Sequence, residues 1–255
     1  MKKIIIPLLI TLIVVAFGCK GKGPGKRDTG ASADTSTVAD TGFTGIKKMM
    51  SGQYVVSEIT FKNGVRDGLM KTFYTDGRVR TTFWYENGLK QDSARWYYEA
   101  GQLFRTTPFK NDTMDGIQKQ FYRTGKIRAK IGYSKGMRTP FFQEFDANGK
   151  LLGGYPEIVA EIRDEYNTKG TYTIDLSLSD KSKKVIFYRG EYTDGRLDTT
   201  KVKVITKDTG TASIILKKGT TEGASSVNVI ASILTPMANR RLVSKKFDLP
   251  YNDLK

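Results

Sequence analysis

The sequence predicts an all-β protein in which an elongated antiparallel sheet of repeated hairpins precedes a smaller β-sandwich. Two observations predict the sheet: glycine recurs at 24-residue intervals, and short alternating strands lie between tight-turn signals. A third observation predicts the sandwich, because after residue 154 the interval is lost and seven strands with different spacing follow. A short apolar segment and a polar linker come before both.

Four columns of residues keep the 24-residue interval without a slip. They are the glycines 77, 101, 125 and 149, the aromatic residues 61, 85, 109 and 133, the aromatic residues 73, 97, 121 and 145, and the aliphatic residues 79, 103, 127 and 151. Each unit has two turn signals, such as Asn63-Gly64 and Asp76-Gly77, which favour the positive φ angles of hairpins. We therefore expect two strands per unit and a β-meander over residues 49–154.

Apolar and polar residues alternate between these turns. In the strand 78–85, Val79, Phe83 and Tyr85 share one face, which predicts an apolar stripe. The other face is predicted to be basic and solvated, with Arg78, Arg80, Lys126, Arg128 and Lys130. In the second strand of each unit, Phe73, Tyr97, Phe121 and Phe145 repeat on one face and Tyr74, Tyr98 and Tyr122 on the opposite face.

The repeated units resemble the MORN-variant repeat, a β-hairpin unit of about two dozen residues. The match is close in residues 61–77 and 109–125. Gln91-Asp92 and Thr139-Pro140 replace the Asp-Gly pair of the pattern, so we expect reshaped corners there. The resemblance implies a β-hairpin scaffold used for many interactions. The family is sometimes labelled an antitoxin component, which the export signal at the N-terminus makes implausible here.

Seven short strands are predicted after Gly154. They are residues 158–162, 171–178, 185–192, 202–206, 212–217, 227–234 and 242–249. This number of short strands in about 100 residues favours an immunoglobulin-like sandwich over residues 155–255. Residues 206–233 also resemble the glycine-punctuated strand pair of bacterial surface Ig-like domains.

The N-terminus has the order of an export signal. Lys2 and Lys3 precede an apolar run at 4–17, which is shorter than the roughly 20 residues that a membrane-spanning helix needs. The segment 16–19 resembles a bacterial lipobox, which implies a signal peptide at 1–18 and lipidation of Cys19, with palmitate among its acyl chains. An incidental thiol behind an ordinary signal and an uncleaved anchor are the alternatives. Residues 19–48 then form a flexible linker, because they are rich in Gly, Ser, Thr and Asp.

The composition restricts the chemistry that is available. The chain has no histidine and one cysteine, so the usual general base, thiol nucleophile and soft metal ligands are missing. We expect a non-enzyme without cofactor or metal. A carboxylate-based hydrolase using Asp164 and Glu165, in a loop-like stretch, is the enzymatic alternative.

The net charge of +16 is spread along the chain and forms no block of five like charges. An exported, lipidated chain meets little nucleic acid, so we expect none as a partner. Anionic lipid head groups, an acidic glycan or an acidic protein surface are the expected partners, against the alternative of general solubility charge.

The expected partner-binding residues are Tyr74, Tyr98 and Tyr122 with three flanking cations, Arg78, Arg123 and Lys126. Exposed aromatic stripes mark interaction surfaces, although packing within the sheet is the alternative for every aromatic column. The expected function is a non-enzymatic, membrane-anchored scaffold that binds an envelope protein. The alternative is a carbohydrate or peptidoglycan binding module that stacks its Tyr ladder on sugars.

Lys20 follows the cysteine, where an aspartate would hold many Gram-negative lipoproteins in the inner membrane. We therefore expect the outer membrane. No acidic run that would signal surface export follows, so we expect the periplasmic side, with exposure at the cell surface left open.

The first prediction concerns lipidation. Cys19→Ala removes the predicted site of acylation, and a stable anchor needs more than one acyl chain. The variant should therefore move from the membrane fraction to the soluble envelope fraction, or remain as unprocessed precursor. Fractionation with palmitate labelling measures this. Labelling that persists in the variant would contradict the assignment.

Overall fold

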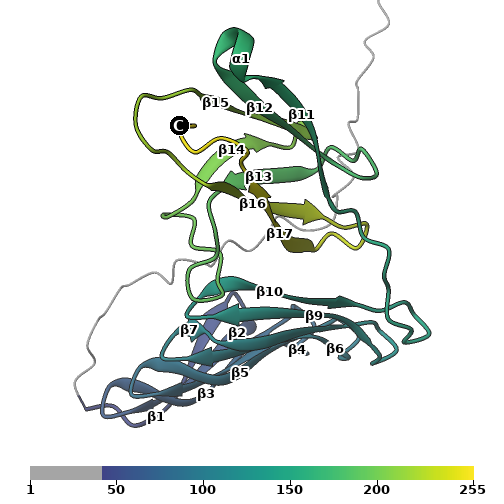
Figure 1. The fold of residues 1–255 in the computed structure, drawn as a ribbon. Coiled ribbons are helices and arrows are strands. Elements are labelled where there is room, and N and C mark those ends of the chain that lie inside the picture. Colours follow the sequence, from purple (N-terminus) through teal and green to yellow (C-terminus); the bar gives the residue numbers. More distant parts are fainter. Residues whose placement is uncertain (1–41) are drawn as a thin grey trace, which may run out of the picture. The chain divides into compact units, whose positions relative to one another are not determined.

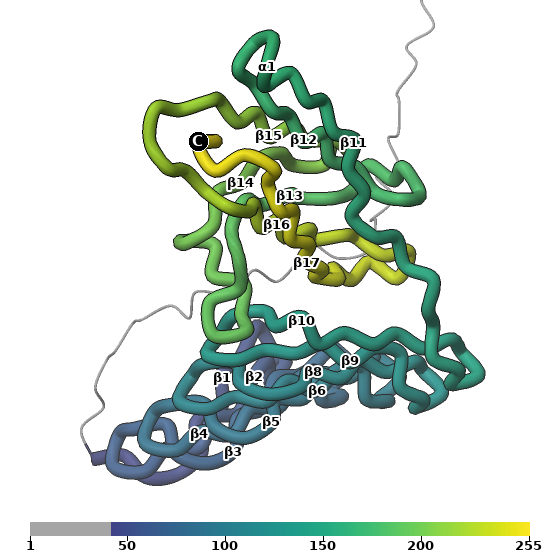
Figure 2. The backbone as a smooth tube through the Cα atoms, in the orientation of Figure 1, coloured from purple at the N-terminus to yellow at the C-terminus, as the bar shows by residue number. Residues whose placement is uncertain are grey.

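The computed structural model describes residues 42–255, which belong to one compact unit (Figures 1 and 2). The predicted signal peptide, Cys19 and most of the predicted linker lie outside the described residues. Within residues 42–255, no helix has the length and apolar composition needed to cross a membrane.

An antiparallel meander forms the first part of the described chain, as predicted. Consecutive strands pair along the sheet, and the short β7 pairs with β6 beside the main path. The strands are β1 (Gly45–Ser51), β2 (Tyr54–Lys62), β3 (Val65–Phe73), β4 (Val79–Glu86), β5 (Leu89–Tyr97), β6 (Leu103–Lys110), β7 (Thr113–Met114), β8 (Gly116–Phe121), β9 (Ile127–Ser134) and β10 (Met137–Glu144). The sheet begins at Gly45, a few residues before the expected start of the repeats, because β1 pairs with β2 along its whole length.

The turns repeat as the sequence predicts. At the second turn of three units the tyrosine N–H donates to the carbonyl four residues later, at 2.8–2.9 Å in Tyr74, Tyr98 and Tyr122. The glycine before that carbonyl has a φ of 83–90° in these three turns, a conformation that L side chains rarely adopt. This requirement explains the glycine column.

The strict alternation predicted from residue 79 is wrong at its start. Thr72 pairs with Thr81, but Phe73 pairs with Val79, so Arg80 is an extra residue in the ladder. Such a bulge breaks the side-chain alternation. Equivalent register shifts occur between Trp96 and Tyr97 and between Gln120 and Phe121, at the same place in the following units.

The corner at Asp92 keeps a positive φ. Its φ of 56° lies in the left-handed region, as do the larger φ values of Gly68 and Gly116 in the equivalent positions. Aspartate is one of the few side chains that tolerate this region. The reshaped corner that we expected is therefore not seen at Asp92. At Pro140 the φ is not positive, but the register shift between Arg138 and Phe142 matches the one at the equivalent corner of the first unit, where Arg66 pairs with Phe61 and Met70 with Ile59.

Seven further strands form two sheets, with a short helix between the first two strands. They are β11 (Ile158–Glu165), α1 (Tyr166–Lys169), β12 (Thr171–Leu178), β13 (Val185–Arg189), β14 (Lys203–Lys207), β15 (Thr211–Lys217), β16 (Ser226–Leu234) and β17 (Arg240–Asp248). The strand orders are β11-β12-β15 and β14-β13-β16-β17. All seven predicted strands are present, and β13 ends earlier than expected.

One hydrophobic core joins these two sheets into a sandwich. Its fully buried side chains include Ile174 and Leu216 from the three-stranded sheet and Phe187 and Val229 from the four-stranded sheet. Leu254, near the C-terminus, packs into the same core. Alternating burial along β15 explains why the strand pattern was readable from the sequence.

Glu144, at the end of β10, links the meander to the sandwich. Its carboxylate is buried and accepts hydrogen bonds from Tyr155 Oη (2.8 Å), Thr235 Oγ1 (2.8 Å) and Asn239 Nδ2 (2.7 Å). Burial, and then the hydrogen bond to Glu144, raise the pKa of Tyr155 well above its usual value. Three donors therefore satisfy a charge that would be costly to bury alone.

The second prediction tests the period. Deleting residues 98–121 removes one complete unit and joins equivalent turns, so the sheet should still unfold cooperatively with a modest loss of stability. Deleting residues 98–109 removes a single strand and reverses the direction of all that follow, so that variant should not fold. Thermal unfolding followed by circular dichroism compares the two. Equal cooperativity in both would contradict the meander.

Candidate partner-binding surface

The three predicted tyrosines join successive repeat units. Each hydroxyl donates to a backbone carbonyl 23 residues later: Tyr74 to Tyr97 (2.6 Å), Tyr98 to Phe121 (2.9 Å) and Tyr122 to Phe145 (2.7 Å). All three side chains are half-buried. The structure therefore gives them a role in holding the array together, and partner binding by their rings stays a prediction.

The three cations predicted beside these tyrosines also lie in the turns. Arg78 forms an ion pair with Asp76 at 2.6 Å, which lowers the pKa of Asp76 through hydrogen bonding. The guanidinium of Arg123 lies 4.9 Å from the ring centre of Tyr98. Lys126 Nζ is 3.4 Å from the carbonyl oxygen of Asn148. The structure thus brings all six residues to one row of turns, where most polar groups already have partners.

A second, unpredicted set of cations crosses the strands of the meander. The pairing register places one residue from each of nine strands in a transverse row, which we call the cationic row: Lys48, Glu58, Lys71, Thr82, Arg95, Thr106, Lys119, Lys130 and Gln143. Residues paired in register project from the same face of a sheet. We call this face the cationic face.

Most charges of the cationic row are uncompensated. Lys48 pairs with Glu58 at 3.3 Å. Within residues 42–255, no ion pair is formed by the other four cations of the row, Lys71, Arg95, Lys119 and Lys130. Their contacts are weaker: Arg95 donates to the carbonyl of Ser93 at 3.3 Å, and Lys130 lies 5.5 Å from the ring centre of Phe145.

An apolar row runs beside the cationic row on the same face. It consists of the residues two positions away in each strand: Ile46, Thr60, Leu69, Trp84, Ser93, Pro108, Ile117, Gly132 and Phe141. Trp84, Ile117 and Phe141 are each 42% exposed, Leu69 is 37% exposed and Ile46 is 60% exposed. Leu69 pairs directly with Trp84. Large apolar side chains are thus left uncovered along the row.

Sequence reasoning missed both rows, although the 24-residue period contains them. Positions 71, 95 and 119 are Lys, Arg and Lys, and positions 69, 117 and 141 are Leu, Ile and Phe. Of the cations that the sequence assigned to the basic face, Lys130 lies in the row. Arg128 is a correction: its Nη2 donates to the carbonyl of Met237 at 2.8 Å, so it contacts the sandwich.

The opposite face of the meander is less exposed from β2 to β10. Residues next to the cationic row form its counterpart there, in the order 49, 57, 72, 81, 96, 105, 120, 129 and 144. Ser57, Thr81, Ala129 and Glu144 of this set are buried. Cations lie over aromatic rings on this side, as Arg105 does over Trp96 at 4.0 Å. Exposed apolar residues of the central strands therefore belong to the cationic face.

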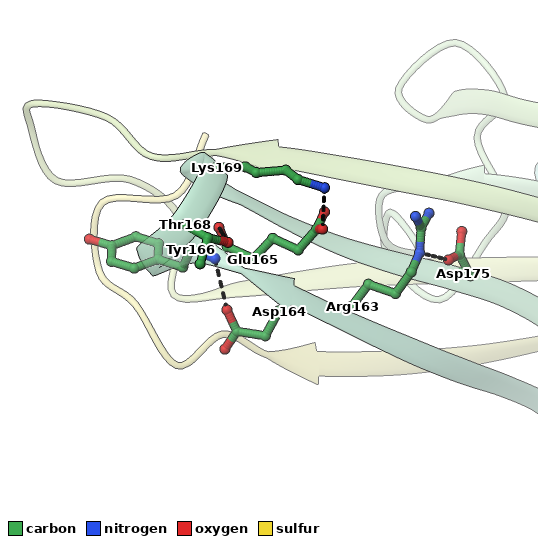
Figure 3. Close-up of polar contacts among 7 residues, drawn as sticks. All are labelled: Arg163, Asp164, Glu165, Tyr166, Thr168, Lys169 and Asp175. Carbon is green, nitrogen blue, oxygen red and sulfur yellow. Dashed lines mark hydrogen bonds and ion pairs between the residues drawn. The ribbon is translucent and has the colours of Figure 1, made fainter.

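The predicted carboxylate pair does not lie in a loop. Asp164 and Glu165 end strand β11, and as neighbours on a strand they project from opposite faces (Figure 3). Asp164 accepts from the Tyr166 N–H at 3.0 Å and the Tyr251 hydroxyl at 2.9 Å. The hydrogen bond from Lys169 lowers the pKa of Glu165, whereas a general acid needs a raised one.

Two further observations concern small ligands. Within residues 42–255, no group of three or more Asp, Glu or Cys side chains is placed to hold a metal ion. A hollow of about 500 Å³ lies on the sandwich, where Tyr155, Pro156 and Pro236 supply apolar surface and Lys183 and Arg241 supply positive charge. Its volume is typical of small-ligand sites.

The sequence comparisons bear on the meander alone. The model of the MORN repeat variant matches residues 93–111 and 114–135. These residues span β5 to β9, which confirms the predicted resemblance in the middle of the sheet. No match is found among curated proteins.

The third prediction concerns the tyrosine hydroxyls. Replacing Tyr74, Tyr98 and Tyr122 together by Phe should lower the free energy of unfolding by roughly 2–4 kcal/mol, since each hydrogen bond contributes about 0.5–1.5 kcal/mol. Urea unfolding measures the loss. Tyr54→Phe is the matched control, because that side chain is half exposed and its hydroxyl accepts a 3.3 Å hydrogen bond from Gln53, its neighbour in the chain. A triple variant as stable as the control would show that the hydroxyls do not join the units.

Proposed function

We propose that the chain is a non-enzymatic lipoprotein, anchored in the outer membrane through Cys19, that acts as a protein-interaction scaffold in a Gram-negative envelope assembly. The observation that carries the scaffold role is the cationic face, which combines unpaired cations with exposed apolar side chains. Such uncovered surfaces mark interaction sites. The match to the MORN repeat variant supports the same role.

The anchor and the sandwich fit this proposal. The order of basic, apolar and small residues before Cys19 supports lipidation, and Lys20 after it supports the outer membrane. We infer that the sandwich is immunoglobulin-like, since seven strands in sheets of three and four have the size of that class. Sandwiches of this kind present loops at both ends, which would give the scaffold a second contact region.

The fourth prediction tests the scaffold role. Tagged full-length protein extracted from its own envelope in mild detergent should carry a partner protein in stoichiometric amount. The comparison strain expresses Cys19→Ala, which should keep its fold but be found in the soluble envelope fraction or as unprocessed precursor. Quantitative mass spectrometry measures the ratio of partner to bait. Bait recovered without any stoichiometric protein would refute the scaffold role.

A carbohydrate or peptidoglycan binding module is the second candidate, and the hollow beside Tyr155 favours it. Tyr155, Lys183, Lys184 and Arg241 would meet an acidic sugar there. On the repeat sheet, the tyrosine hydroxyls are engaged within the array, which leaves only ring surface for stacking. If this candidate is right, soluble peptidoglycan fragments should release the protein from an insoluble glycan matrix. If it is wrong, the same fragments should leave the complexes between this protein and its partner proteins intact.

A further inference from the structure

The cationic and apolar rows together describe one elongated binding surface. The apolar row contributes Leu69, Trp84, Ile117 and Phe141, and the cationic row lies about 6.6 Å away, two residues along each strand. From β3 to β10 the rows cross six strand spacings, or about 29 Å. This span equals that of about 19 helical or nine extended residues.

The twist of the sheet limits which kinds of molecule can bind along this whole surface. Neighbouring strands rotate by about 20–25°, so the cationic face turns by roughly 120–150° between β3 and β10. A flat lipid bilayer would touch only a few strands of such a surface. A single chain segment can follow the rows along their whole length.

The charge and polarity of the two rows exclude further kinds of ligand. A second copy of the chain would bring the unpaired cations of two rows against each other, which like-charge repulsion disfavours. An acidic glycan would satisfy the cations but leave Leu69 and Ile117 against polar hydroxyls. A segment with carboxylates on one side and apolar side chains on the other satisfies both rows at once.

We propose that the occupant of the cationic face is an acidic, amphipathic polypeptide segment of another envelope protein, laid across the strands of the meander. Its apolar side chains pack on Leu69, Trp84 and Ile117. Its carboxylates pair with Lys71, Arg95 and Lys119. This inference rests on the proposed scaffold function and names the site and the partner's chemistry.

Site-specific photo-crosslinking of the full-length, membrane-anchored protein in cells tests the proposal. The photo-reactive residue p-benzoylphenylalanine replaces Trp84 or Ile117 in two variants. A third variant carries it at Ile215, which is 59% exposed on the sandwich and serves as the matched control. Mass spectrometry then identifies the molecule bound at each position. We expect positions 84 and 117 to capture the same acidic, apolar-containing segment, at least fivefold above position 215.

A variant without three charges of the cationic row is used in the second part of the experiment. Lys71→Ser, Arg95→Ser and Lys119→Ser together should reduce that crosslink at least fivefold. Lys203→Ser, Lys207→Ser and Lys217→Ser remove the same charge from exposed positions on the sandwich and should leave it unchanged. Unfolding temperatures of both triple variants, compared with the unsubstituted protein, verify that the fold is kept.

Crosslinks from positions 84 and 117 to lipid, to glycan or to a second copy of the chain would overturn the inference, and so would a captured segment without net negative charge. Crosslinking yields at these positions equal to that at position 215 would also overturn it. So would a crosslink that the loss of the charges at 71, 95 and 119 leaves unchanged. If detergent extraction recovers a stoichiometric partner while the row variant keeps it, the scaffold role stands and this site fails. If no partner is recovered at all, the scaffold role itself fails.

Discussion

The hydrogen-bonded register of the meander is the constraint on which both of its faces depend. A slip of one residue between two strands would exchange the faces of everything beyond it. Nine strands keep the cationic row on one side and the set ending at Glu144 on the other. The repeated corners hold this register, because each introduces its bulge at the same place in the unit. The tyrosine hydroxyls then tie each unit to the next.

The two parts of the described chain are stabilised differently. The sandwich has a closed apolar core, with Phe187, Leu216 and Leu254 fully buried. The meander covers one face with smaller or polar groups, such as Thr81 and Ala129, and with cations lying over aromatic rings. A single sheet cannot bury both faces, so its stability depends on cross-strand contacts that repeat with the period. The exposed cationic face is the consequence of this architecture.

Much of the fold was predictable because it follows from local periodicity. The 24-residue columns predicted the meander, and runs of alternating residues between turn signals predicted all seven strands of the sandwich. The bulge at Arg80 was not predictable from alternation, since an extra residue is invisible until its partner strand is known. The end of β11 was misjudged for a related reason: Asp164 and Glu165 look like loop residues, yet both are held in register by β12.

The candidate site was predictable only in part. The turn tyrosines were found because they are aromatic and periodic, but their hydrogen bonds to the next unit need the register. The cationic row was missed because Lys71, Arg95 and Lys119 alternate with Thr82 and Thr106, and a row across strands cannot be read along the chain. Arg128 is the opposite error, because alternation assigned it to the solvated basic face but its side chain contacts the sandwich.

The two edges of the meander also govern how readily the protein aggregates. Free strand edges recruit strands from other molecules, which leads to aggregation. At one end, β1 places Lys47 and Lys48 at the edge. At the other, Pro140 removes a backbone donor from β10, where the register is already irregular. β10 is therefore a poor template for fibril growth, whereas β1, with Ile46, Met49 and Met50 exposed, depends on its lysines to keep other strands away.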